Sequence, residues 1–265
     1  MENAALSSIV KEIKKKKEIS GIKDSLVVET LSLVLKRQNL SENDLEKVKS
    51  FDRKLIVKEV RSILRLMHAR FQSSSKNRDK MIDEGNFEQL LKSHSSTKER
   101  LSSYDQLKSL IDGLKVSSIL DLGCGLNPIA LGSSKIKYYA YDINENELSL
   151  IKKYFAEKNI TGKVSSFDLS KTEEYSFPEA DICLVLKVLD LFGKRKYEVT
   201  EAILKKIKCK YFLISFSTAK LSGKSMNNPI RKWFESILER NNYSFEIINT
   251  SNEIFYLIKN PSAEI

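Results

Sequence analysis

The sequence predicts an α/β fold, in which a seven-stranded sheet follows an N-terminal helical module. Two changes of pattern support this. In the first part of the 265-residue chain, apolar residues recur at three- and four-residue spacings, as they do on amphipathic helices. From about residue 117, short apolar runs alternate with helical stretches, which is typical of βαβ units. We therefore expect a helical module at residues 1–92 and a sheet domain at residues 93–265.

Apolar periodicity marks the helices of the first module. Ile9, Ile13 and Ile19 are the spaced apolar residues of a first expected helical segment. No proline occurs before Pro128 to interrupt a helix. The further helices are expected at Ser25–Leu35, Leu45–Phe71 and Met81–Leu91, with a polar loop at Ser73–Arg78.

The second part contains seven expected strands. They are Ser118–Asp121, Tyr138–Asp142, Lys163–Phe167, Ile182–Lys187, Tyr211–Phe216, Phe245–Thr250 and Glu253–Ile258. The helical stretches between them include Glu145–Glu157, Glu198–Lys206 and Pro229–Asn241. The first five strands alternate with helices, whereas the last two are close enough in sequence to form an antiparallel pair.

The first expected strand ends in a motif that indicates a cofactor with an adenosine. Asp121 is followed by a turn containing Gly123 and Gly125, which lets backbone N–H groups approach a ligand closely. Asp142 ends the second strand, where a carboxylate accepts hydrogen bonds from ribose hydroxyls. A dinucleotide-binding motif has a third glycine after this turn, but here Leu-Asn-Pro128 follows, so the motif does not match a dinucleotide site. The pattern Asp-x-Gly-x-Gly resembles motif I of methyltransferases that use S-adenosyl-L-methionine (SAM), where it holds the amino-acid end of the cofactor; the alternative is an ordinary glycine-rich turn.

Two other segments offer contacts to such a cofactor. Asp168, just after the third strand, is placed to accept the adenine amino hydrogens, or else it caps the following turn. Ser96 and Glu99 have the spacing of a capping box, which predicts the start of a helix. Arg100 in the same segment is a candidate for bidentate pairing with the SAM carboxylate.

The net charge of +10 is concentrated in two regions. Residues 1–80 hold 19 Lys and Arg against 11 Asp and Glu, and the span from Lys194 to Lys232 holds 11 basic residues against two acidic ones. Two basic regions beside a cofactor site favour a polyanionic substrate. The alternative is a solvated, lysine-rich surface.

Other compositional features narrow the class of protein. No apolar run reaches the roughly 20 residues that a membrane crossing needs, and the N-terminus lacks the apolar segment of a signal peptide, so we expect a cytoplasmic protein without a membrane partner. Three widely spaced cysteines and two histidines predict neither a disulfide nor a metal site.

Several segments together resemble one enzyme family. They are HSSTKERL from His94, LDLGCGLNPIAL from Leu120, ISFSTAKLSGK from Ile214, KWFE from Lys232 and IFYLIK from Ile254. In order and spacing they are similar to the 16S ribosomal RNA guanine-N7 methyltransferases that confer aminoglycoside resistance, over roughly residues 60–260. The resemblance implies a Rossmann-like, seven-stranded SAM-dependent methyltransferase domain. It also implies a helical module that docks on the 30S subunit, and a protein that acts as a monomer.

The resemblance also implies site residues. Those matching the family's cofactor contacts are Phe71, His94, Ser95, Ser96, Arg100, Gly123, Asp142, Asp168, Leu169 and Leu186. Those matching its substrate-facing positions are Lys187, Lys220 and Lys224. The chain departs from the family at Ser217, where the family has proline, and in the basic run Lys194-Arg-Lys196, where some members carry glutamine.

The available residues agree with methylation at guanine N7. This atom has an exposed lone pair, so the enzyme needs no general base and has only to align the base with the methyl group. Methylation at carbon 5 needs a cysteine nucleophile, and Cys183 lies within an apolar strand. Trp233 and Phe234 either stack on a flipped base or pack a helix onto the sheet. The alternatives are a methyltransferase for another RNA position or a small molecule, and a non-catalytic RNA-binding relative.

Overall fold

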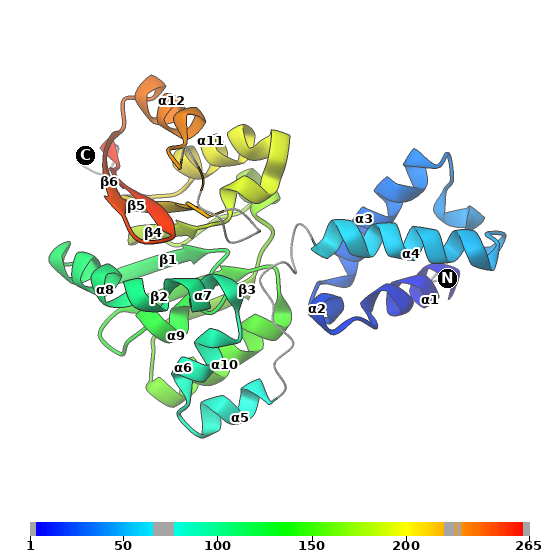
Figure 1. Ribbon diagram of the computed structural model, residues 1–265, viewed down its shortest axis with the longest axis horizontal. Helices are drawn as coiled ribbons and strands as arrows, with labels where there is room; N and C mark the ends of the chain where they lie inside the picture. The colour runs from blue at the N-terminus through cyan, green and yellow to red at the C-terminus, as the bar shows by residue number, and fades with distance from the viewer. Residues whose placement is uncertain (1–3, 66–76, 220–225, 227–228, 262–265) are drawn as a thin grey trace. The chain divides into compact units, whose positions relative to one another are not determined.

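A computed structural model describes residues 4–65, 77–219, 226 and 229–261 (Figure 1). The chain divides into two compact units. One consists of residues 1–76 together with 143–146, and the other of residues 77–142 and 147–265. Residues 77–92, which the sequence pattern groups with the helical module, lie within the second unit.

The first unit is helical, as predicted. Its elements are α1 (Ala4–Lys14), α2 (Lys17–Ser20), α3 (Asp24–Arg37), the 3-10 helix η1 (Glu42–Glu46) and α4 (Ser50–Leu64). Isoleucine, valine and leucine side chains from these elements form its core. The predicted helix from Leu45 begins later, at Ser50, because Asp44 accepts hydrogen bonds from the backbone N–H (2.9 Å) and hydroxyl (2.6 Å) of Ser41 and closes a separate 3-10 turn. The end of that predicted helix lies outside the described residues.

Short helices lead from the start of the second unit to its sheet. They are α5 (Arg78–Asp83), α6 (Phe87–Lys92), α7 (Ser95–Arg100), η3 (Leu101–Ser103) and α8 (Tyr104–Gly113). The prediction of one helix over Met81–Leu91 is wrong, because Gly85 adopts φ +67° and ends α5. Asn86 then caps α6 by accepting a hydrogen bond from the Gln89 backbone N–H at 3.4 Å.

The predicted seven-stranded sheet is confirmed. Its strands are β1 (Ser118–Leu122), β2 (Lys137–Asp142), β3 (Gly162–Ser166), β4 (Ala180–Leu186), β5 (Cys209–Ser217), β6 (Ser244–Asn249) and β7 (Glu253–Lys259). Their order across the sheet is β3-β2-β1-β4-β5-β7-β6. β1 to β5 pair in parallel, whereas β7 runs antiparallel to both β5 and β6.

Helices cover both faces of the sheet (Figure 1). They include α9 (Asn127–Leu131), α10 (Glu145–Lys158), α11 (Lys196–Lys206) and α12 (Lys232–Arg240), with 3-10 turns η4 (Leu169–Glu174) and η5 (Leu189–Arg195). One core joins the sheet to α6, α8, α9 and α10, and a second joins the opposite face to α11 and α12. No helix among the described residues has the length and apolar character needed to cross a membrane.

The topology gathers the predicted polar residues at one edge of the sheet. The glycine turn follows β1, Asp142 ends β2, and Lys187 follows β4. Carboxyl ends of adjacent parallel strands meet at the same edge, where open α/β sheets bind their ligands.

Candidate active site

The glycine turn after β1 is tied to the end of β2. The backbone N–H groups of Gly123 and Cys124 donate to the carbonyl of Tyr141 at 2.8 and 3.0 Å, and Gly125 N–H donates to Asp142 Oδ2 at 2.9 Å. Gly123 and Gly125 have φ values of +70° and +50°. A Cβ at Gly125 would lie 2.9 Å from the His94 ring, so this position needs glycine for space as well as for conformation.

Asp121 is a fully buried carboxyl group beneath this turn. Its Oδ2 accepts a hydrogen bond from the Tyr138 hydroxyl at 2.7 Å, whereas its Oδ1 accepts none from the described residues. Burial raises the pKa of Asp121 to about 7, against the opposing effects of the Tyr138 hydrogen bond and the Arg100 charge. Oδ1 is therefore shielded from water and accepts no well-formed hydrogen bond from the described residues, although the Asn127 side chain is near enough to lower the pKa of this carboxyl group.

Arg100, at the end of α7, lies at the centre of a buried polar network. Its guanidinium pairs with Glu253 through two contacts, Nε to Oε2 at 3.0 Å and Nη2 to Oε1 at 2.7 Å. Nη1 donates to Asn127 Oδ1 at 2.7 Å, and Tyr104 donates to the same oxygen at 2.8 Å. Burial acts to lower the pKa of Arg100, but the Glu253 carboxylate outweighs it and holds the pKa above its ordinary value.

Lys187 connects this network to the end of β4. Its backbone has φ +60°, a left-handed conformation that is uncommon outside glycine and often marks a functional position. The ammonium contacts Glu99 at 2.7 Å and Glu253 at 3.4 Å, and the side chain is almost completely buried. Burial tends to raise the pKa of Glu253, but Arg100 and Lys187 together lower it, so this carboxylate stays charged.

The first turn of α7 differs from its prediction. The helix begins at Ser95 with His94 as its N-cap, so the capping box assigned to Ser96 and Glu99 is wrong. Ser96 lies inside the helix, where its hydroxyl is 3.5 Å from Arg100 Nη2, and Glu99 pairs with Lys187 instead. His94 is buried against the glycine turn, and burial lowers its pKa to about 4, which keeps the imidazole neutral.

The remaining predicted residues lie at the same edge of the sheet or outside the described part of the chain. Asp168 caps η4 by accepting from the Ser170 backbone N–H at 2.9 Å, and the buried Leu169 side chain faces Gly123. Leu186 is the last residue of β4 and is buried. Phe71, Lys220 and Lys224 lie outside the described residues.

The comparisons with known proteins decide the family. The model of the ribosomal RNA methyltransferase (FmrO) family matches residues 48–257. The chain belongs to this family. A 16S rRNA (guanine(1405)-N(7))-methyltransferase of Serratia marcescens is 30% identical over 188 residues, which cover 67% of this chain and 72% of that protein. An enzyme of the same name from Frankia casuarinae is 25% identical over 174 residues, which cover 63% of this chain and 61% of that protein.

Solved structures of 16S rRNA methylases share the fold. RmtF, in complex with S-adenosyl-L-homocysteine, is 19% identical with a TM-score of 0.78, covering 98% of this chain and 100% of that chain. RmtB is 22% identical with a TM-score of 0.74, and the match covers 96% of this chain and 98% of RmtB. ArmA is 30% identical with a TM-score of 0.56, covering 71% and 100%. The resemblance drawn from the sequence motifs is confirmed: the chain is a member of a ribosomal RNA methyltransferase family.

The site of this methyltransferase fits the amino-acid end of SAM. The buried Oδ1 of Asp121 suits an ammonium group, since the buried carboxylate and the buried ammonium would then pair with each other. Side chains at Gly123 and Gly125 would meet Val188 and His94, so the turn keeps its bare backbone beside Asp121. Asp142, from β2, adds a half-exposed carboxylate beside the turn.

Sequence reasoning missed four members of the network. Asn127 and Tyr104 orient the Arg100 side, Tyr138 holds Asp121, and Glu253 pairs with Arg100. One signal was present: Glu253 is a lone carboxylate at the start of an apolar strand, and a buried charge of this kind requires a partner.

Proposed function

We propose that this methyltransferase transfers the methyl group of SAM to N7 of guanine 1405 of 16S rRNA within the 30S subunit, and that the modification confers aminoglycoside resistance. The observation that carries the proposal is the 30% identity over 188 residues to an enzyme named for that reaction.

The chemistry of the site supports an N7 target. Bound SAM supplies an electrophilic methyl group on a sulfonium, and the N7 lone pair is the nucleophile, so no residue has to remove a proton. The chain correspondingly needs no thiolate. Cys124, Cys183 and Cys209 are buried and free, and burial raises the pKa of each thiol. Trp233 and Phe234 pack against β5 through Phe216, and Phe234 is fully buried, so this residue does not stack on a base.

The positions of several side chains support a set of cofactor contacts. Asp121 binds the SAM ammonium and Arg100 its carboxylate, because Asp121 is a buried acceptor beneath the glycine turn and Arg100 is a fully buried cation. Asp142 binds the ribose hydroxyls and Asp168 the adenine amino group. By correspondence with the family, we assign further cofactor contacts to His94, Ser95, Ser96, Gly123, Gly125, Leu169 and Leu186, and to Phe71, which lies outside the described residues. Lys187, Lys220 and Lys224 position the RNA substrate.

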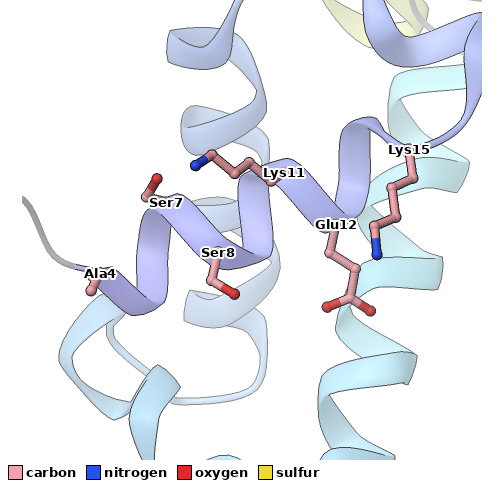
Figure 2. A pocket seen from close by; sticks show the side chains of 6 residues that line it. All are labelled: Ala4, Ser7, Ser8, Lys11, Glu12 and Lys15. Carbon is pink, nitrogen blue, oxygen red and sulfur yellow. The ribbon is translucent and has the colours of Figure 1, made fainter.

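Within the predicted docking region at residues 1–92, we assign docking on the 30S subunit to the helical unit, because residues 77–92 belong to the sheet unit. Residues 1–80 have eight more basic than acidic residues, and a shallow hollow along α1 presents Lys11 and Lys15 (Figure 2). Glu12, which lines the same hollow, is paired with Arg53 at 3.0 Å, which reduces its repulsion of phosphates. The protein acts as a cytoplasmic monomer. We expect its affinity for 30S subunits to fall steeply with salt while its affinity for SAM hardly changes, as measured by filter binding and calorimetry.

Methyl transfer to defined substrates tests this function. Purified protein and tritiated SAM are incubated with 30S subunits, naked 16S rRNA and small-molecule extracts, with Asp142→Ala as a cofactor-binding control. We expect label in 30S subunits and one new site of borohydride- and aniline-dependent strand cleavage, which reports N7-methylguanosine. Transfer without a new cleavage site would refute the N7 assignment, and label only in small molecules would refute an RNA substrate.

A further inference from the structure

An exposed tyrosine packs against the only tryptophan of the sequence. Tyr197, in the first turn of α11, is 47% exposed, and its ring meets the Trp233 ring of α12 edge to face, with centroids 5.3 Å apart. The Lys196 ammonium lies 4.4 Å from the centroid of the Trp233 ring and 5.5 Å from that of Tyr197. We call these three residues the aromatic platform.

The platform is anchored to the sheet at the edge that carries the active site. Trp233 packs against Phe216, a buried residue near the carboxyl end of β5, with centroids 5.7 Å apart. Arg231, just before α12, donates to Asp190 Oδ2 at 3.0 Å and thereby joins α12 to the turn that precedes α11. These contacts fix the start of α12 on β5 and against the turn before α11, so Trp233 and the Tyr197 ring beside it are positioned before any ligand binds.

The surroundings of the platform are basic. Lys194 is exposed immediately before α11, and Lys232 is exposed at the start of α12. The nearby acidic residue Glu198 is paired with Arg195 at 3.1 Å, so its charge is offset. Proteins that bind single-stranded nucleic acid use a fixed aromatic ring to stack on an unpaired base, and nearby cations to bind the adjoining phosphates.

We propose that the aromatic platform is an RNA-binding subsite, in which Tyr197 stacks on an unpaired base of the substrate and the lysines contact the adjoining phosphates. This inference rests on the proposed RNA substrate, but it concerns binding rather than the methylated atom. It gives a function to the basic run at Lys194–Lys196.

The single tryptophan allows binding to be measured at the platform itself. Excitation at the red edge of the absorption band reports Trp233 alone, and the probe is a single-stranded RNA octamer of mixed sequence. We expect saturable quenching in the wild type and in Tyr197→Phe, and at least about tenfold weaker binding in Tyr197→Leu, which keeps apolar bulk but cannot stack. Equal quenching in the leucine variant and the wild type would overturn the proposal.

Kinetics with 30S subunits provide the second readout. We expect Tyr197→Ala and Tyr197→Leu to raise KM for 30S subunits about tenfold or more, with SAM affinity within about twofold of the wild type and Tyr197→Phe near normal. Lys196→Ala should raise KM as well, whereas Lys205→Ala, an exposed lysine at the far end of α11, is the charge-matched control. A wild-type KM in the leucine variant, or an equal effect of both lysine changes, would overturn the subsite. RNA-dependent quenching without methyl transfer to 30S subunits would refute the proposed function and leave the subsite standing.

Discussion

Binding of SAM should be coupled to the loss of a proton from Asp121. The carboxyl group has a pKa of about 7 in the free site because burial raises it and the nearby Asp142 carboxylate adds to the effect. An ammonium group beside it favours the carboxylate and lowers this pKa. The form that binds the cofactor is therefore the deprotonated one, so affinity should rise with pH and a proton should be released on binding.

The size of the effect follows from the pKa. Most Asp121 carboxyls are protonated at about pH 5.5 and most are ionised at about pH 7.5, so the association constant should rise about twentyfold, or about 1.8 kcal/mol, over this range. The range ends there because α-amino groups such as that of SAM begin to lose their own proton near pH 7.7–8.0. Neighbouring groups do not interfere, since the lowered pKa of His94 keeps it neutral and the lowered pKa of Glu253 keeps it charged.

Titration calorimetry in buffers of different ionisation enthalpy measures both the affinity and the protons released. Two controls isolate Asp121. The compound 5′-methylthioadenosine keeps the adenosine but lacks the amino-acid end, and Asp121→Asn has no proton to lose, so both should give flat profiles. A flat profile for SAM with the wild type, or the same slope with 5′-methylthioadenosine, would refute the assignment of Asp121 to the ammonium.

Three further predictions concern stability and the cofactor. Between about pH 5 and pH 7 the native Asp121 keeps a proton that the unfolded chain has lost. The free energy of unfolding of the wild type should therefore fall by about 2–3 kcal/mol relative to that of Asp121→Asn as pH rises over this range. The same pH dependence of the urea-unfolding free energy in both proteins would contradict this. Glu253→Gln leaves the Arg100 charge buried without its partner and should cost about 3–5 kcal/mol in denaturant unfolding. The double change Arg100→Met with Glu253→Leu should cost less than the sum of the single changes, and simple additivity would argue against the pair. Asp142→Ala should weaken SAM binding by about 1–3 kcal/mol while the protein stays folded, and an unchanged calorimetric affinity would exclude its role at the ribose.

The centre of the sheet could be predicted from the sequence because β1, β4 and most of β5 are buried on both faces. Such strands appear as continuous apolar runs, and the strands ending at Asp121 and Asp142 are separated by a helix, as in parallel units. The glycine turn was predictable for a related reason, since two glycines between a strand and a helix indicate positive φ values, which the structure confirms.

Local patterns failed where a competing interaction decided the outcome. Gly85 sits within a stretch of good apolar periodicity, but its positive φ divides the predicted helix into α5 and α6. Ser96 and Glu99 have capping-box spacing, yet Glu99 pairs with Lys187, a residue 88 positions away in the chain. The pairing of Arg100 with Glu253 spans 153 positions and depends on the antiparallel docking of β7 on β5, which no local pattern encodes.

The Arg100–Glu253 pair also changes how the cofactor carboxylate must be bound. A guanidinium has five N–H donors, and the contacts of Arg100 with described residues leave one Nη1 donor for a ligand. Glu253 therefore acts as the group that orients Arg100, with its own charge balanced further by Lys187 at 3.4 Å. A zwitterion suits this arrangement: its carboxylate meets the oriented arginine, and its ammonium ionises Asp121, so every buried charge gains a partner. An adenosine compound without the amino-acid end offers no cation to Asp121 and no carboxylate to Arg100, so we expect the cluster to favour ligands that carry this zwitterion.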